Sequence, residues 1–131
     1  MTYPGLPKHP DHALLLALAN PDFGHGGILA LDLGSRERAF EFMGLLQNEN
    51  QFGLMAVSLG YSETLMSCSA SSTSSEMPDE ELAKAGIMPG LVRMSIGYTG
   101  TLEQRWSQLR SVLERMGPVS RGATAPPIQA S

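Results

Sequence analysis

The sequence has little of what several classes of protein depend on. It contains a single cysteine, Cys68, which excludes a disulfide framework within the chain and a zinc site built from thiolates. Basic residues are outnumbered 9 to 13 by acidic ones, for a net charge of -4, so the positive excess typical of nucleic-acid-binding proteins is missing. The longest unbroken apolar run, residues 13–19, is too short to cross a bilayer, and no secretory pattern opens the chain. We therefore expect a soluble, cytoplasmic protein with no nucleic-acid or membrane partner.

What the sequence does contain is a regular alternation of short apolar segments with amphipathic ones, on a chain long enough for one domain. Strands are predicted at residues 28–33, 52–59, 61–68 and 91–97. Helices are predicted at residues 10–20, 35–47, 78–86 and 101–117, and residues 67–75 form a serine-rich loop. This order predicts an α/β fold, a two-layer sandwich in which about four strands form a sheet with helices mainly on one face.

Two of the predicted helices have apolar stripes that we expect to pack in the core. Ser35 is the expected cap of one, and Thr101 with Gln104 forms a capping-box pattern for the other. The first stripe consists of Ala39, Phe40, Phe42, Met43 and Leu46. The second consists of Leu102, Trp106, Leu109, Leu113 and Met116. Their spacing of three and four residues is typical of a face turned toward a core, and we favour that reading over a partner-binding helix.

The strand predicted at 91–97 carries the first candidate for a binding role. Its residues alternate, so that Val92, Met94 and Ile96 share one face while Arg93, Ser95 and Gly97 share the other. A guanidinium presents a planar fork of donors that matches a carboxylate. From the residues alone, a carboxylate ligand and a surface ion pair are equally good interpretations of Arg93.

Several short motifs in a fixed order resemble one family. The chain is similar, over residues 3–116, to the C-terminal domain of the pyridoxal-phosphate (PLP) enzymes of cysteine and methionine metabolism, the trans-sulfuration family. The motifs that carry the resemblance are Tyr3-Pro4-Gly5-Leu6 with His9-Pro10, Phe23-Gly24, Ser58-Leu59-Gly60 with Glu63-Thr64-Leu65, Ala85-Gly86-Ile87 and residues 90–97. Within the family, Met66-Ser67-Cys68-Ser69 and residues 71–75 and 100–104 are most similar to the plant-type methionine γ-lyases.

The resemblance implies the small domain of a fold-type-I enzyme. Residues 1–9 would be a linker from a PLP-binding domain missing from this sequence, residues 10–117 the C-terminal substrate-side domain, and residues 118–131 a disordered tail. The full-length enzyme would be a homo-oligomer, a tetramer as in the family. No metal site is expected, because the three histidines have no accompanying carboxylate or cysteine cluster.

The resemblance also assigns residues to a substrate site. Arg93 matches the arginine that binds the substrate α-carboxylate, and Ser58 matches a loop serine beside the same carboxylate. Val57 stands where cystathionine γ-lyases tend to have an acidic residue, and an apolar residue there favours a thioether. Where many relatives have a His-Pro pair and then a Thr-His pair, this chain departs from the pattern with Cys68-Ser69 and Thr73-Ser74.

The implied activity is that of a PLP-dependent carbon–sulfur lyase acting on a sulfur amino acid. Methionine γ-elimination would give methanethiol, 2-oxobutanoate and ammonia. The chain's two lysines, Lys8 and Lys84, do not stand in the Ser-x-Thr-Lys context of the family's Schiff-base lysine, so we expect no catalytic residue here and an inactive chain on its own. A cystathionine γ-synthase or γ-lyase domain and a non-catalytic stand-alone fragment are the alternatives.

Overall fold

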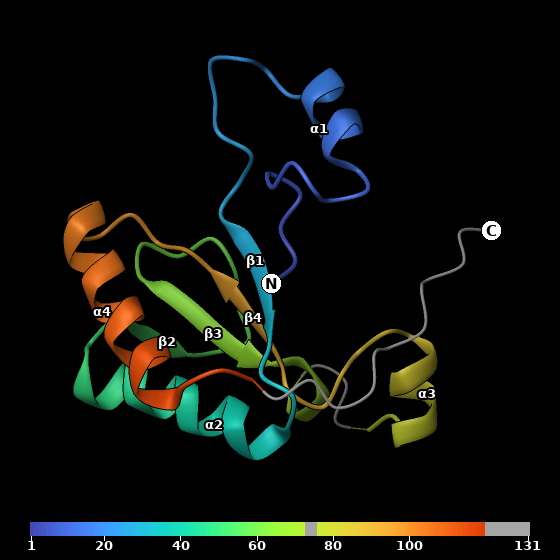
Figure 1. Cartoon of the computed structure of the whole chain (residues 1–131), viewed down its shortest axis with the longest axis vertical. Helices are drawn as coiled ribbons and strands as arrows, with labels where there is room; N and C mark the ends of the chain where they lie inside the picture. Colours follow the sequence, from blue (N-terminus) through green and yellow to red (C-terminus); the bar gives the residue numbers. More distant parts are fainter. Residues whose placement is uncertain (73–75, 120–131) are drawn as a thin grey trace.

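The computed structural model describes residues 1–72 and 76–119 and contains one four-stranded sheet (Figure 1). In spatial order the strands are β1 (Ile28–Asp32), β4 (Leu91–Ser95), β3 (Thr64–Cys68) and β2 (Gly53–Met55). β4 pairs antiparallel with both β1 and β3, whereas β2 pairs parallel with β3. The predicted α/β class and four-stranded sheet are confirmed.

Only some of the described helices lie against this sheet, and those that do share one side of it. The helices are α1 (His12–Leu18), α2 (Arg36–Gly44), α3 (Asp79–Lys84) and α4 (Leu102–Met116), with a π-helical turn at Leu45–Glu49 and a 3₁₀ turn at Ser69–Ser71. α2 and α4 cover one sheet face and form the second layer, while α1 stands apart, beyond β1 (Figure 1). Among the described helices, none has both the length and the apolar character needed to cross a membrane.

The two long helices begin at the predicted caps. Ser35 Oγ accepts a hydrogen bond from Arg38 N at 3.3 Å, and Thr101 Oγ1 accepts one from Gln104 N at 3.2 Å. Hydrogen bonding to its own backbone N–H and to the Ser35 hydroxyl holds the pKa of Glu37 below its ordinary value. These bonds satisfy N–H groups that the first helical turn leaves without partners.

The core fills the space between the sheet and helices α2 and α4. β3 and β4 contribute Met66, Cys68, Val92 and Met94, all almost completely buried. α2 and the following turn contribute Ala39, Phe42, Met43 and Leu46. The alternation predicted for the arginine-bearing strand therefore holds for its first two apolar residues. It is wrong for Ile96, which is 40% exposed because β4 ends at Ser95.

The apolar stripe predicted on the last helix is confirmed only for Leu109 and Met116, which pack against the core, and is wrong for Leu102, Trp106 and Leu113. Leu102 is 80% exposed and Trp106 53%, whereas Val112 is 3% exposed. Polar side chains fix this rotation of α4. Arg105 donates to the Gln51 and Phe52 carbonyls, and Gln108 exchanges hydrogen bonds with Asn50, which turns the 105–108–112 side toward the sheet layer. Specific polar contacts thus outweigh the hydrophobic period.

Other boundaries also differ from the sequence prediction. The strand expected at 52–59 is only Gly53–Met55, and the next begins at Thr64 instead of residue 61. Phe40 is 46% exposed and does not belong to the core. The serine-rich segment begins later than expected, because Ser67 and Cys68 still pair within β3. Its Thr73-Ser74 pair, and residues 120–131 of the predicted tail, lie outside the described residues.

We predict that Gly97 cannot be replaced by alanine without loss of stability. An added Cβ would overlap the backbone at Ser62 and Glu63 and come within 2.6 Å of Thr64 N, so the start of β3 would have to move. Overpacking of this kind costs about 1–3 kcal/mol. Urea unfolding of Gly97→Ala, followed by circular dichroism, measures the loss.

The matched control is Gly44→Ala in α2, where an added Cβ meets nothing within 4 Å and the backbone is already helical. This variant is expected to gain up to about 1 kcal/mol from helix propensity. Equal stabilities for the two variants would contradict the close approach of β3 to Gly97.

Candidate functional site

A loop of residues 56–62 crosses the sheet face opposite to the helices. Its start is fixed to β3 because Ala56 N donates to Met66 O at 2.9 Å. In its middle, Gly60 N donates to Ser95 Oγ at 3.0 Å, and at its end Ser62 O accepts from Tyr98 N at 3.0 Å. The loop is thereby held over β3 and β4, and its backbone is presented to side chains of the outer face.

Arg93 is the side chain that meets this loop. It projects from β4 on the face opposite to Val92 and Met94, and its Nη2 donates to Val57 O at 2.7 Å and to Ser58 O at 3.4 Å. The structure therefore brings together the three residues that sequence reasoning selected. It does so through the backbone of Val57 and Ser58, while their side chains remain exposed.

The chemistry of this arrangement is that of a partly satisfied anion site. The two partners of Arg93 Nη2 are neutral backbone carbonyls. No carboxylate is paired with Arg93 within the part of the chain that the structure describes. A carboxylate offers two oxygens and a full charge, so it forms shorter and stronger bonds with a guanidinium than a carbonyl does. The carboxylate role itself remains a prediction.

Ser67 belongs to the same neighbourhood, although the sequence prediction left it where the strand 61–68 overlaps the serine-rich loop 67–75 and gave it no role. It lies in β3 directly opposite Arg93, is 6% exposed, and its Oγ has no hydrogen-bond partner among the described residues. Arg93 Nε is likewise buried without a partner there. The alternation of Leu65 and Ser67 with Met66 and Cys68 was the available signal, and the run of serines that follows obscured it.

A pocket of about 190 Å³ opens beside this pair, where β3 runs past the end of β2. Phe40, Met43 and Met55 give it an apolar wall, and Val57 and Ser67 also line it. The exposed position of Phe40, unexpected for a core residue, is explained by this opening. The pocket therefore adjoins the candidate site but does not include Arg93.

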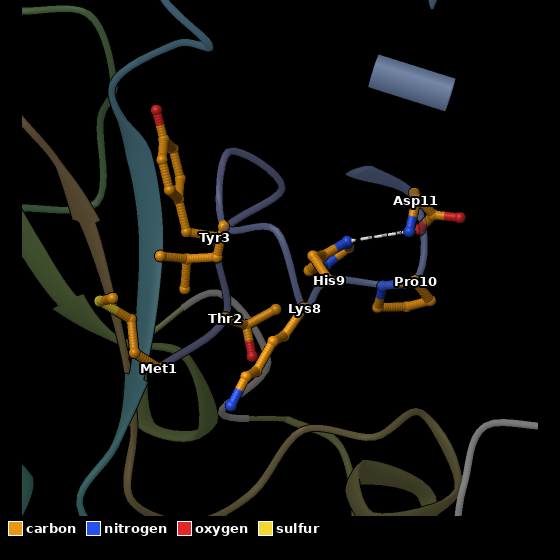
Figure 2. Close-up of a pocket in the computed structure, with 8 residues that line it drawn as sticks. Met1, Thr2, Tyr3, Lys8, His9, Pro10 and Asp11 are labelled. Atoms are coloured by element: carbon orange, nitrogen blue, oxygen red, sulfur yellow. Dashed lines mark hydrogen bonds and ion pairs between the residues drawn. The ribbon is translucent and has the colours of Figure 1, made fainter. Parts of the chain in front are cut away.

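A larger hollow of about 400 Å³ lies in the N-terminal segment and shares no lining residue with the Arg93 site (Figure 2). His9 Nδ1 accepts from Asp11 N at 3.2 Å on its wall, and Lys8 extends away from both (Figure 2). The other lysine, Lys84, is exposed in the last turn of α3. Neither lysine lines the pocket beside Val57 and Ser67.

Glu63 holds the end of the loop in place. Its Oε2 accepts from Thr99 Oγ1 at 2.8 Å and lies 3.2 Å from Arg105 Nη2. Arg105 also donates to the carbonyls of Thr99, Gln51 and Phe52. This Glu63–Thr99–Arg105 clamp joins the segment before β3, the segment after β4 and helix α4.

Comparison with known sequences gives a consistent set of relatives. A sequence model of the family described as Cys/Met metabolism PLP-dependent enzyme matches residues 1–103. The chain is 57% identical over 114 residues to methionine gamma-lyase of Arabidopsis thaliana, covering 87% of this chain and 26% of that protein. It is 38% identical over 95 residues to cystathionine gamma-lyase of Bacillus subtilis strain 168, covering 72% of this chain and 23% of that protein.

Solved structures agree with these sequences. A cystathionine gamma synthase from Xanthomonas oryzae pv. oryzae, in complex with cystathionine, superposes with a TM-score of 0.69 at 35% identity, covering 86% of this chain and 27% of that one. A Campylobacter jejuni structure described as an O-acetylhomoserine (thiol)-lyase, which contains N'-pyridoxyl-lysine-5'-monophosphate, gives 0.70 at 29% identity, covering 86% and 25%. The chain spans about a quarter of the length of these relatives.

We predict that Arg105→Met destabilises the fold by about 2 kcal/mol, because the clamp loses its cation and several partly buried acceptors lose their donor. Arg105 has a side chain only 19% exposed. Arg110, whose side chain is 56% exposed and 3.6 Å from Glu114, is the matched control. Arg110→Met is expected to change the free energy of unfolding by no more than about 0.5 kcal/mol. Equal losses in urea unfolding would show that the clamp does not hold the fold.

Proposed function

The chain belongs to the Cys/Met metabolism PLP-dependent enzymes, and on this premise we propose that it forms the substrate-carboxylate part of a methionine γ-lyase. This membership confirms the family resemblance found in the sequence. The proposed reaction converts methionine to methanethiol, 2-oxobutanoate and ammonia. The observation that carries the proposal is the position of Arg93, whose guanidinium lies on the carbonyls of Val57 and Ser58 with no carboxylate partner among the described residues.

In this proposal Arg93 binds the α-carboxylate of the amino acid and fixes its orientation. Fixing one end of a substrate restricts rotation and aligns the reacting bonds, which contributes to rate as well as to binding. Ser58 lies next to the guanidinium and its exposed side chain is available to the same carboxylate. Val57, 60% exposed, adds an apolar surface that suits a thioether better than a second charged group.

The family uses pyridoxal phosphate, which supplies the electron sink for such eliminations. The described residues of this chain do not fit that group as a binding site, because Lys8 and Lys84 are exposed on elements separate from Arg93. We propose that the Schiff-base lysine is supplied from outside this chain. The substrate site is then shared between this chain and the part of the protein that holds the cofactor. We further propose that the whole enzyme is a cytoplasmic homo-oligomer.

Cystathionine γ-synthase or γ-lyase chemistry is the second candidate, and relatives bearing these names support it. Val57 favours methionine, since cystathionine carries a second charged amino-acid head. Release of methanethiol from methionine, compared with turnover of cystathionine by the same preparation, distinguishes the two reactions.

A non-catalytic stand-alone chain is the third candidate. The visible spectrum of the 131-residue chain with added pyridoxal phosphate distinguishes a non-catalytic chain from one that binds the cofactor covalently without any other part of the protein. Once unbound cofactor is removed, a visible absorption band that borohydride converts to a pyridoxyl group on Lys8 or Lys84 would show that this lysine binds the cofactor covalently.

We predict that Arg93→Ala, introduced into the intact gene product, raises the KM for L-methionine and lowers kcat. The charge-assisted contact and the alignment are both lost, so kcat/KM should fall at least about a hundredfold. Formation of 2-oxobutanoate and methanethiol measures the rate. Arg110→Ala, which removes an exposed arginine from α4, is the control and should leave both constants unchanged. Parental kinetics in the Arg93 variant would refute the assignment.

A further inference from the structure

Arg93, Ser67 and the start of the 56–62 loop lie in one row across the outer face of the sheet. Ser67 is the register partner of Arg93 between β3 and β4. On the other side of β3, Met55 is the partner of Met66 and Ala56 N bonds to Met66 O, so the loop leaves the sheet beside Ser67. To reach Val57 O, the side chain of Arg93 must therefore cross β3 at Ser67.

Two buried polar atoms in this row lack hydrogen-bond partners among the described residues. They are Arg93 Nε and Ser67 Oγ, and the whole Ser67 residue is 6% exposed. A buried polar atom without a partner is destabilising, because it has lost its water and gained no replacement, and such atoms are therefore uncommon. The two atoms are complementary in kind, because Nε–H is a donor and a hydroxyl oxygen can accept.

The contacts of Arg93 explain why its Nε–H does not donate to Ser67 Oγ. Its Nη2 already donates a hydrogen bond to the loop, to Val57 O at 2.7 Å. A bound carboxylate would compete for that donor more strongly than a neutral carbonyl. Once Nη2 leaves Val57 O, the guanidinium can shift along the row. Ser67, its register partner in β3, offers a buried hydroxyl oxygen that has no hydrogen-bond partner among the described residues.

We propose that Ser67 is a positioning residue of the carboxylate site. When a carboxylate takes the outer donors of Arg93, the Ser67 hydroxyl accepts a hydrogen bond from Nε–H and fixes the plane of the guanidinium. This inference rests on the proposed function, since it requires that Arg93 bind the carboxylate. Ser67 then affects the affinity for the carboxylate by orienting Arg93, without contacting the ligand itself.

The test follows the Arg93 Nε–H resonance in ¹H–¹⁵N spectra of the full 131-residue chain, with the peak assigned by its loss in Arg93→Lys. L-methionine is the probe, and L-methioninol, which lacks the carboxylate, is the control ligand. Methionine should shift the resonance downfield and methioninol should not. Ser67→Ala should abolish the shift and weaken methionine binding about tenfold, because one hydrogen bond to a charged group is lost.

Two further variants separate positioning from a general effect on folding. Ser67→Thr keeps the hydroxyl and should restore both the shift and the affinity. Ser107→Ala removes a hydroxyl from the exposed side of α4 and should behave as the parent. A parental shift and affinity in Ser67→Ala would overturn the role of Ser67 and leave the carboxylate site standing. Equal binding of methionine and methioninol, or methionine binding that leaves the Arg93 resonance undisturbed, would overturn both.

Discussion

The antiparallel pairing of β3 with β4 is the constraint on which the rest of the structure depends. It places Met66 beside Met94 and Cys68 beside Val92, and burial of these side chains against α2 and α4 fixes which face of the sheet is internal. Because strand side chains alternate, the same register puts Arg93 on the outer face. The hydrophobic core thus decides where the binding group lies, although no core residue belongs to the site.

The 56–62 loop completes the site around Arg93 on the outer face of the sheet. It is held by backbone bonds to β3 and to the segment after β4, and the Glu63–Thr99–Arg105 clamp braces the chain where the loop ends. These contacts do not involve Arg93. The loop is therefore preorganised to present its carbonyls to the guanidinium, and a ligand meets a formed surface instead of ordering one, which reduces the cost of binding.

The sequence predicted the fold class, the order of the elements and the nearness of Arg93 to Val57 and Ser58, because alternation, capping residues and family motifs report local structure. It failed where tertiary polar contacts decide. The rotation of α4 depends on Gln108 and Asn50, which are distant in sequence and outside any hydrophobic period. Ser67 was missed for a related reason, since strand pairing, and not composition, made it a buried neighbour of Arg93.

In the proposed site, Arg93 exchanges the carbonyl of Val57 for the carboxylate of an amino acid. A crystal structure of the intact gene product grown with L-methionine tests it most directly. We expect both carboxylate oxygens within hydrogen-bonding distance of the Arg93 guanidinium, with Val57 O no longer accepting from Nη2. Methionine bound elsewhere, with Nη2 still on the carbonyls of Val57 and Ser58, would contradict it.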